Sequence, residues 1–481
     1  MNVLLTGATG YVGRRLQERL ASCPSVRLRL LVRNALKVQT AARENIEVIE
    51  GSTFDTTSLK AAARGIEAAY YLIHSMGAGK DFPELERASA INFRDACIEA
   101  GVKRIIYLGG LGTKQTASEH LLSRIETGEL LSSRPGLIQT LWFRAGVIVG
   151  SGSASFEIIR NLVQKIPIMV TPRWVMNRTQ PVAISDVLDY LGNALTLNAA
   201  GNLIIDIGGE PKSFREMILE AAEVMGLKRH VITFPFFTPR LSSYWLLILS
   251  PVPYSIARAL VDGLKSETLV ENDKAREYFP GIRPMPYRRA VIRAIEEITR
   301  NQVLSRWCDS SAKKVCDIQG PEKTAEAVYT DTHRYDLEDV PSEKVFESFS
   351  SLGGDQGWFR YNWLWRLRGF LDKLAGGPGL NRGRRDPHEL RIGDSLDFWK
   401  VQDVKENKRL LLLSQMSLPG SAWLEFSIQG RTFIQTAYFL PKGLSGRLYW
   451  YSMKLPHLLI FPNLAKNILR RARGSTSTET P

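Results

Sequence analysis

The chain has 481 residues, 44% hydrophobic and 23% charged, which is enough for two or three globular domains of ordinary composition. Its formal net charge of +14 favours anionic partners such as cofactor phosphates or an anionic membrane surface. We expect no nucleic-acid partner, because the sequence has no zinc-finger spacing, no aromatic RNP-type strand and no basic heptad region.

The four cysteines and six histidines are scattered, and no two cysteines form a C-x-x-C pair. This pattern argues against a metal site and indicates a reducing compartment. No run reaches the roughly 18 apolar residues that a membrane-spanning helix needs. The chain also begins directly with a strand pattern, which leaves no room for a signal peptide. We therefore expect a cytoplasmic protein, with peripheral contact to an anionic membrane as an open alternative.

The first thirteen residues, M-N-V-L-L-T-G-A-T-G-Y-V-G, predict a strand, a glycine-rich turn and the start of a helix. In this context Gly7 allows the tight turn, Gly10 leaves room for a pyrophosphate, and Gly13 lets the helix pack closely on the strand. The helix N-terminus would then direct its N–H groups and its positive dipole end at the phosphates. We interpret this stretch as a dinucleotide-binding loop rather than an ordinary strand–helix turn.

Residues 1–150 alternate strands and helices, which predicts a Rossmann-type, doubly wound parallel sheet in an α/β fold. The clearest helices are Pro83–Ala100 and Glu119–Ser132. The expected strands are Asn2–Leu5, Arg27–Val32, Ile46–Glu50, Ala68–Ile73, Arg104–Leu108 and Thr140–Phe143. In such a sheet, ligands bind at the carboxyl ends of the strands.

The end of the second strand bears on the choice of cofactor. NAD sites usually place an acid there to hold the ribose 2′-hydroxyl. Here the residues are Val32-Arg33-Asn34, with the cations Lys37 and Arg14 nearby in the sequence pattern. Cations suit a 2′-phosphate, so we expect NADP(H) rather than NAD(H). The alternative is that Arg33 is a solvated surface residue.

Residues 150–300 are predicted to form a small substrate lobe. Ser155–Val163 reads as a helix, and Gln180–Ile184 reads as a strand before Asp186, which we expect to cap the next helix. Ser213 and Glu216 form a capping box. The aromatic and proline-rich stretch Phe234–Val261 is interpreted as a buried helix pair, with an apolar substrate wall or a membrane-facing patch as the alternative.

A second pattern begins after a linker at residues 306–327, so we predict domains at 1–305 and 328–474 and a disordered tail at 475–481. Its strands are Val328–Leu337, Ser395–Val404, Arg409–Ser417, Ala422–Ile428 and Thr432–Leu440. Its helices are Pro341–Phe349, Trp358–Leu374 and Leu444–Arg473, the last broken or kinked near Pro456 and Pro462. This order predicts an α+β domain in which a sheet curls around a helix.

Three stretches carry a family resemblance: T-G-A-T-G-Y-V-G at the start, R-I-I-Y-L-G-G-L-G at 104–112 and F-R-A-G-V-I-V-G at 143–150. They resemble extended and atypical short-chain dehydrogenases/reductases, above all the NmrA-like branch and the nucleotide-binding accessory subunit of respiratory complex I. Residues 382–401, R-G-R-R-D-P-H-E-L-R-I-G-D-S-L-D-F-W-K-V, resemble an uncharacterised bacterial domain similar to the helix-grip (START/SRPBCC) fold.

The first resemblance implies a set of cofactor contacts, with the adenine near Ser52 and Thr53 and the nicotinamide ribose passing the ends of the fourth and fifth strands. The implied cofactor-binding residues are Gly7, Thr9, Gly10, Tyr11, Val12, Gly13, Arg33, Ser52, Thr53, Ile73, His74, Gly109 and Gly110.

The catalytic pattern departs from that of the family. A standard member has a proton-shuttling Tyr, a Lys four residues later and a Ser at the end of the fifth strand. Here the Tyr and Lys positions resemble His120 and Arg124, and the Ser position falls among Gly109 and Gly110. His is able to act as a general acid, whereas Arg stays protonated and cannot relay a proton. The alternative is that His120 is simply a helix residue, with His74, Tyr107 and Tyr71 as fallback donors.

Three functions therefore stay open. The leading hypothesis is an NADPH-dependent oxidoreductase that acts on an apolar or quinone-like small molecule. The second is a non-catalytic NADP(H)-binding sensor or scaffold, and the third is a hydrophobic-ligand-binding protein that works through its C-terminal domain. The basic, aromatic helix Trp358–Leu374 is interpreted as packed in its own domain, with an interfacial helix on anionic lipid as the alternative. The sequence gives no oligomeric state.

Overall fold

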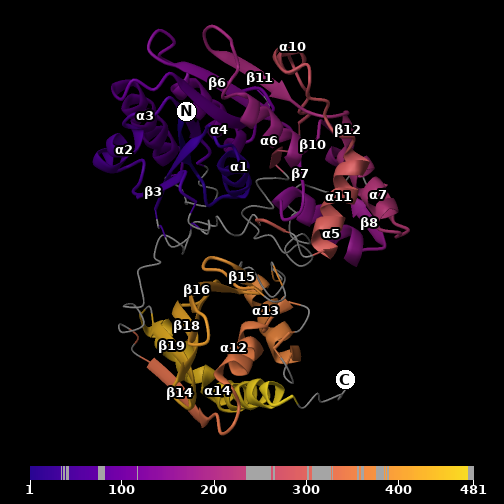
Figure 1. The fold of residues 1–481 in the computed structure, drawn as a ribbon. Coiled ribbons are helices and arrows are strands. Elements are labelled where there is room, and N and C mark those ends of the chain that lie inside the picture. Colours follow the sequence, from indigo (N-terminus) through magenta and orange to yellow (C-terminus); the bar gives the residue numbers. More distant parts are fainter. Residues whose placement is uncertain are drawn as a thin grey trace. The chain divides into compact units, whose positions relative to one another are not determined.

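The chain divides into two compact units, Met1–Lys313 and Lys314–Pro481 (Figure 1). The computed structural model describes residues 1–33, 35, 38, 43–73, 82–115, 117–233, 262–263, 266–300, 303–305, 327, 329–354, 357–358, 362–374, 384, 386, 389–441 and 443–474. The stretch Phe234–Val261, most of the expected linker and the tail 475–481 lie outside these residues.

The first unit is built on a seven-stranded parallel sheet in the order β11-β6-β5-β4-β1-β2-β3, as the alternating pattern predicted. The strands are β1 (Asn2–Thr6), β2 (Arg27–Val32), β3 (Ile46–Glu50), β4 (Ala68–Tyr71), β5 (Arg104–Gly110), β6 (Gln139–Ala145) and β11 (Leu203–Ile207). The fourth strand ends at Tyr71, two residues before the predicted end. The strand order reverses beside β1, which is where open α/β sheets bind ligands.

Helices cover both faces of this sheet because its central strands are apolar on both sides. Successive β1 residues alternate between two cores: Val3 and Leu5 pack with helices α1 (Tyr11–Ala21) and α6 (Ile184–Asn193). Leu4 packs in the opposite core with α2 (Thr56–Ala63), α3 (Phe82–Glu99) and α4 (Glu119–Leu131). The sheet is therefore doubly wound.

A smaller lobe has its own apolar core, contributed mainly by α5 (Ala154–Lys165), α7 (Phe214–Val224) and α11 (Tyr287–Thr299). The predicted capping box is present at the start of α7, where Ser213 and Glu216 each cap the other's backbone N–H. The short elements around this core are β7 (Ile148–Val149), β8 (Ile168–Thr171), the 3-10 helix η2 (Arg173–Met176), β9 (Arg178–Thr179), β10 (Val182–Ala183), β12 (Lys212–Ser213) and β13 (His230–Thr233). The short helix α10 (Lys274–Tyr278) packs instead on the main sheet beside β11.

The predicted role of Asp186 as a helix cap is wrong. The strand β10 is only two residues long, and α6 begins at Ile184 with Ala183 as its N-cap. Asp186 therefore lies inside the first turn, where its carboxylate accepts a hydrogen bond of 2.6 Å from the backbone N–H of Met285. Burial raises the pKa of this carboxyl group. Asp186 ties the chain before α11 to α6.

The second unit is built on a six-stranded antiparallel sheet in the order β14-β19-β18-β17-β16-β15, and its described residues include three helices. Its strands are β14 (Tyr329–Asp336), β15 (Ser395–Leu396), β16 (Trp399–Lys405), β17 (Arg409–Ser414), β18 (Gly420–Gln429) and β19 (Thr432–Pro441). Its helices are α12 (Ser342–Ser350), α13 (Asn362–Leu374) and α14 (Gly443–Ala472). One face of the sheet packs with α12 and α14 in a single core.

Two features predicted for the helices of this unit differ clearly from the structure. The last helix is not broken: α14 runs without interruption for 30 residues and contains both Pro456 and Pro462. The helix predicted from Trp358 begins at Asn362, and Trp358 itself lies in a preceding turn. Its buried indole N–H donates to the Asp397 carboxylate at 2.7 Å, which holds Trp358 beside the turn between β15 and β16.

Candidate nucleotide-binding site

The glycine loop between β1 and α1 is built as a dinucleotide-binding turn requires. Gly7 has a φ of +73°, and a Cβ added to it would lie 2.4 Å from the Leu72 carbonyl oxygen. A Cβ added to Gly13 would lie 2.1 Å from the Gly7 carbonyl oxygen, so the helix packs directly on the loop. Both positions exclude a side chain, and together they bring the start of α1 to the carboxyl end of β1.

The start of α1 is suited to an anion. Its N-cap is Gly10, which makes no side-chain capping bond, and the first turn contains no acidic residue. The Gly10 N–H donates to the Gly7 carbonyl at 2.9 Å, which closes the loop. Thr9 and Val12 beside it are half-buried. Because the helix dipole is positive at this end, the uncapped turn favours phosphate.

The side chain of Tyr11 lies against Gly150 and Arg15. Its hydroxyl is buried, and a Cβ added to Gly150 would lie 2.6 Å from it. The Arg15 guanidinium lies 5.1 Å from the Tyr11 ring centroid, and the Ser305 hydroxyl donates to the Tyr11 carbonyl at 3.0 Å. Burial raises the pKa of the Tyr11 hydroxyl. Any contact of Tyr11 with a phosphate would therefore use its backbone N–H.

The predicted 2′-phosphate position at the end of β2 carries both a cation and an acid. Arg33 directly follows β2 and is exposed. Glu50, at the end of the neighbouring strand β3, pairs in register with Val32 of β2 and is also exposed. This residue was not among those predicted from the sequence. An exposed carboxylate here opposes the attraction of Arg33 for a 2′-phosphate. Asn34 and Lys37 lie outside the described residues.

At the expected adenine position, the Thr53 side chain already has a hydrogen-bonding partner in the protein. Thr53 is buried, and its hydroxyl lies 2.7 Å from the Ser89 hydroxyl, which in turn lies 2.7 Å from that of Tyr71. The Ser52 backbone N–H donates to the Ser58 hydroxyl at 3.3 Å. Ile73 is half-buried just beyond β4, and His74 lies outside the described residues.

A side chain at either of the last two residues of β5 would meet a neighbouring side chain at close range. A Cβ added to Gly109 would lie 2.6 Å from the indole nitrogen of Trp142, and one added to Gly110 would lie 2.9 Å from a methyl carbon of Leu121. The Trp142 indole occupies the position that a side chain at residue 109 would take. The packing of Trp142 therefore explains why residue 109 is a glycine and not a serine with a hydroxyl group.

The structure brings Arg124 to the end of β5. Its Nη2 donates to the Leu108 carbonyl, and its own carbonyl accepts from the Tyr107 hydroxyl at 2.9 Å. The buried Nε of Arg124 has no hydrogen-bond partner within the described part of the chain. His120 lies one turn earlier on α4 and is half-buried. Arg124 is therefore placed beside the end of β5.

The fallback donors Tyr71 and Tyr107 are core residues, at 1% and 2% exposure. The Tyr71 hydroxyl is engaged with Ser89, and the Tyr107 hydroxyl with Arg124. Burial raises the pKa of Tyr107 to about 12. Neither hydroxyl reaches the surface of the strand ends.

The sequence reasoning missed an ion-pair cluster at the carboxyl ends of β6 and β11. Arg144 donates to both carboxylate oxygens of Asp206, at 2.6 and 2.8 Å, and to Glu271 at 2.9 Å. The Asp206 side chain is fully buried. Asp206 also accepts the backbone N–H of Glu271 at 2.8 Å, so the cluster fastens residues 270–272 to the sheet. The partners are too far apart in sequence for a motif to reveal them.

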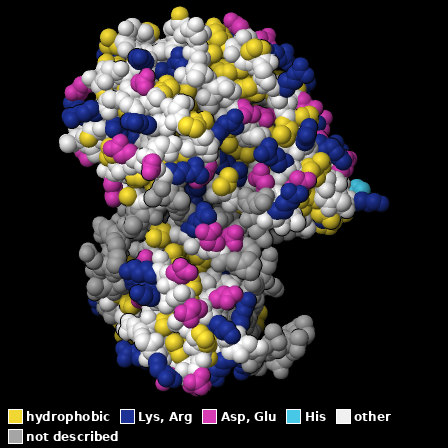
Figure 2. Space-filling view, viewed as in Figure 1, with side chains coloured by type: hydrophobic (Ala, Val, Ile, Leu, Met, Phe, Trp, Pro, Cys, Tyr) yellow, Lys and Arg dark blue, Asp and Glu magenta, His cyan; other side chains and the backbone are white. Residues whose placement is uncertain are grey.

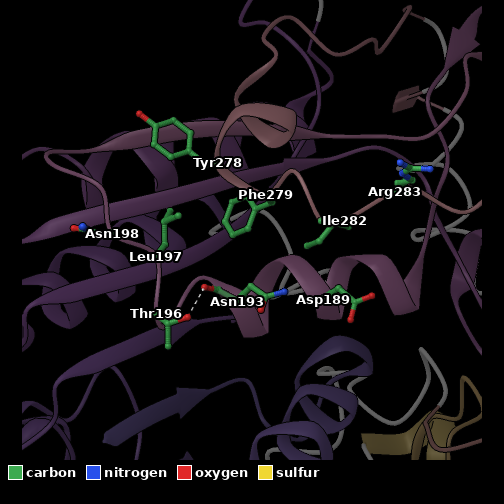
Figure 3. A pocket seen from close by; sticks show the side chains of 10 residues that line it. Asp189, Asn193, Thr196, Leu197, Asn198, Tyr278, Phe279, Ile282 and Arg283 are labelled. Carbon is green, nitrogen blue, oxygen red and sulfur yellow. Dashed lines mark hydrogen bonds between the residues drawn. The ribbon is translucent and has the colours of Figure 1, made fainter.

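A separate open pocket of about 800 Å³ lies between α6 with its following loop and the chain after α10. Its lining includes Asp189 and Asn193 of α6 together with Phe279 and Ile282 (Figure 3). Another of its lining residues, Leu197, accepts through its carbonyl from Arg104 at the beginning of β5. The pocket is therefore near the amino ends of the strands and is distinct from the glycine loop.

Positive charge is dispersed over the face drawn in Figure 2, where Lys and Arg alternate with Asp and Glu among the described residues. Within those residues, no three His, Cys, Asp or Glu side chains are grouped to hold a metal ion. No helix of the described part combines the length and apolar character needed to cross a membrane. Cys23 and Cys97 are free thiols, the former exposed and the latter buried.

Two family models match different parts of the chain. Residues 7–131, which contain the glycine loop and β5, match a model described as NAD(P)H-binding. Residues 324–464 match a model described as a protein of unknown function. The matches fall in separate structural units.

The curated relatives are a reductase and an epimerase. A (4-alkanoyl-5-oxo-2,5-dihydrofuran-3-yl)methyl phosphate reductase of Streptomyces griseus is 30% identical over 122 residues, which are 25% of this chain and 39% of that relative. A UDP-glucose 4-epimerase of Vibrio cholerae is 24% identical over 246 residues, covering 46% of this chain and 75% of the relative.

Among solved structures, a triphenylmethane reductase of Citrobacter sp. is similar with a TM-score of 0.51 and 21% identity, over 62% of this chain and 100% of that one. This likeness concerns the fold. Together with the glycine loop and the strand order, the comparisons show that the first unit has a Rossmann-type fold in which residues 7–131 are similar to NAD(P)H-binding domains, and that residues 324–464 are similar to a domain of proteins of unknown function.

Proposed function

We propose that the protein is an NADPH-dependent oxidoreductase that acts on an apolar or quinone-like small molecule. The observation that carries the proposal is the uncapped start of α1, held against the glycine loop at the point where the strand order reverses. The reductase relative from Streptomyces griseus supports this reaction class. The apolar substrate is supported by the composition of 234–261, which lies outside the described residues.

In this reaction a bound NADPH supplies the hydride, and the chain holds the reactants and provides a proton. Arg124 is permanently charged and lies at the end of β5, which suits it to holding a ribose or a phosphate. His120, one turn earlier on α4, is the proposed general acid for the substrate oxygen.

The preference for NADPH depends on Arg33 prevailing over Glu50. In an Arg33→Ala variant we expect the Kd for NADPH to rise about tenfold, because a charge-assisted contact to phosphate is lost, while the Kd for NADH changes little. In Glu50→Gln, which removes the opposing negative charge, we expect the Kd for NADPH to fall and the Kd for NADH to stay unchanged. Fluorescence titration measures the Kd of each cofactor for the wild type and for both variants. Equal changes for both cofactors would contradict the proposed phosphate contact.

Turnover is tested with a panel of carbonyl compounds, enones and quinones, by following NADPH oxidation. The control is Gly10→Val, because Gly10 has a backbone conformation (φ −82°, ψ 174°) that valine adopts readily, while its side chain would obstruct the phosphates. We expect turnover that this variant abolishes. A panel without turnover above the control would exclude the oxidoreductase.

A non-catalytic NADP(H) sensor is the second candidate, and the crowding at Gly109 favours it. Trp142 and Leu121 fill the space in which a carbonyl-orienting hydroxyl would lie. The discriminating variant is His120→Ala. A loss of turnover with unchanged NADPH affinity supports the enzyme, whereas unchanged biological function supports the sensor.

For the C-terminal unit we propose a helix-grip fold that binds a hydrophobic ligand. Its first strand, β14, pairs with its last, β19, and α14 packs against both, which supports that fold. Gln435 on β19 is 1% exposed, and neither amide atom has a partner within the described residues. Such a group favours an internal polar contact with a ligand or water. Native mass spectrometry of the full chain and of Gln435→Leu tests for a bound molecule.

A further inference from the structure

Two helices of the C-terminal unit expose apolar side chains on their outer faces. On α13 these lie at positions i, i+4 and i+7, and on α14 they extend over sixteen positions. They are Trp363 (61% exposed), Leu367 (47%), Phe370 (47%), Leu444 (73%), Leu448 (63%), Tyr451 (62%), Leu458 (58%) and Leu459 (62%). We refer to these eight residues as the outer apolar face.

The opposite sides of both helices are buried in the core of the unit. Trp365 of α13 and Phe461 of α14 are 3% and 5% exposed. The two helices are neighbours, because Arg368 of α13 donates to the Tyr449 hydroxyl and lies 3.7 Å from the sulfur of Met453. The outer apolar face is therefore a surplus of exposed hydrophobic area beyond what the fold needs.

The charge around this face has one sign along α14. The helix contains five basic residues, Arg447, Lys454, Lys466, Arg470 and Arg471, and no acidic residue. Arg447 and Lys454 are exposed and lie between the exposed leucines in sequence. A helix with exposed leucines on one side and only positive charge beside them matches the pattern of an interfacial helix on anionic lipid.

The charge also disfavours a second copy of the chain as the occupant. A two-fold dimer through α14 would bring the same uncompensated basic residues against each other. An anionic bilayer provides both of the required complements, a negative surface for Arg447 and Lys454 and an apolar layer for the leucines.

We propose that the outer apolar face of α13 and α14 binds the surface of an anionic lipid bilayer, with the leucines entering the boundary between headgroups and acyl chains. Arg447 and Lys454 then lie at the level of the lipid phosphates. This property is independent of cofactor binding in the first unit.

The test is flotation of the full chain with vesicles of phosphatidylcholine containing about one third phosphatidylglycerol, and with pure phosphatidylcholine. We expect binding to the anionic vesicles only, and at least about tenfold weaker binding for Leu448→Gln/Leu459→Gln, because buried apolar area is lost. Arg447→Gln/Lys454→Gln should weaken binding by about fivefold per charge. The matched control is Leu137→Gln, which alters a 64% exposed leucine of the first unit and should bind like the wild type.

Circular dichroism and urea denaturation show whether the second unit of each variant is folded, and Leu444→Gln replaces the double variant if that one unfolds. The proposal is overturned if the wild type does not float with anionic vesicles, or if the leucine variants bind as tightly as Leu137→Gln. It is likewise overturned if the leucine variants abolish self-association in sedimentation experiments without lipid, since the face would then be a protein interface.

Discussion

The Trp142 indole beside Gly109 determines what the end of β5 is able to hold. Its ring lies against Gly109 on one side and against Gly128 of α4 on the other, where an added Cβ would lie 2.3 Å from a ring carbon. Two glycines thus make room for one tryptophan, at the position where relatives of the resembled family carry a catalytic serine.

We therefore expect Gly109→Ser to reduce stability without creating activity. Inserting a side chain into a packed core costs about 1–3 kcal/mol of unfolding free energy. Gly136→Ser is the matched control, because a Cβ there meets no atom within 4 Å. Urea denaturation measures both variants. A Gly109→Ser protein of wild-type stability with a raised kcat would show that the indole is easily displaced.

His457 on α14 gives the second unit a pH-dependent stability. Burial and the nearby Arg368 lower its pKa to about 4, and His333 adds to this effect while Asp331, 3.7 Å away, opposes it. The unfolded chain therefore binds a proton before the folded one does, and stability is lost as the pH falls from 6.5 towards 4.

The expected loss over this interval is at most about 3 kcal/mol, and His457→Gln should remove that part of the pH dependence. Urea denaturation of the wild type and the variant at several pH values measures the difference. His230→Gln, at an exposed position in the other unit, is the control and should follow the wild type. Parallel curves for wild type and His457→Gln would exclude this histidine as the cause.

At the scale of elements, the Arg144–Asp206–Glu271 cluster joins the segment before α10 to two strand ends. Asp206→Ala leaves Arg144 without its buried partner and should cost about 3–5 kcal/mol of unfolding free energy. The exposed pair Arg19–Asp189 is the control, and Asp189→Ala should cost less than about 1 kcal/mol. Thermal unfolding of the first unit measures both. Similar losses for the two variants would mean that the cluster is not a structural clamp.

The elements that sequence predicted best are those whose signals are local. The strands from Asn2 to Phe143 were found because their apolar runs are bounded by glycine or charged residues, and the Ser213–Glu216 box was found because its bonds span three residues. Asp186 was misassigned because its partner, the Met285 N–H, is 99 residues away. The continuity of α14 through Pro456 and Pro462 depends on packing against α12, β14 and β19, which no local pattern contains.

In the candidate site, too, the sequence predicted local features and missed contacts between distant residues. Gly7 and Gly13 could be identified, because their spacing reflects backbone contacts within one turn. The proximity of Glu50 to Val32 depends on the register between β2 and β3, and the filling of Gly109 depends on a tryptophan on the next strand. Both of these tertiary contacts bear on cofactor choice and catalysis, so the sequence left those questions open.

At the scale of the whole molecule, the two units have separate cores and should unfold separately. We expect two transitions in calorimetry, of which only one rises when NADPH is added, because a ligand stabilises the unit that binds it. At a concentration of about 100 Kd the gain is about 2.7 kcal/mol. The Gly10→Val variant is the control and should show no shift. A single transition that moves as a whole would indicate that the units are energetically coupled.

The pairing of β14 with β19 also sets the order in which the second unit is assembled. Tyr329 pairs with Phe439 and Asp336 with Thr432, so the strand that begins the unit meets its neighbour only after all the other strands have been made. As the chain leaves the ribosome, β16, β17 and β18 are able to form hairpins in sequence, whereas β14 has to wait with its edge unpaired. Completion of this unit thus comes late in synthesis, when the Rossmann domain has long been available to fold.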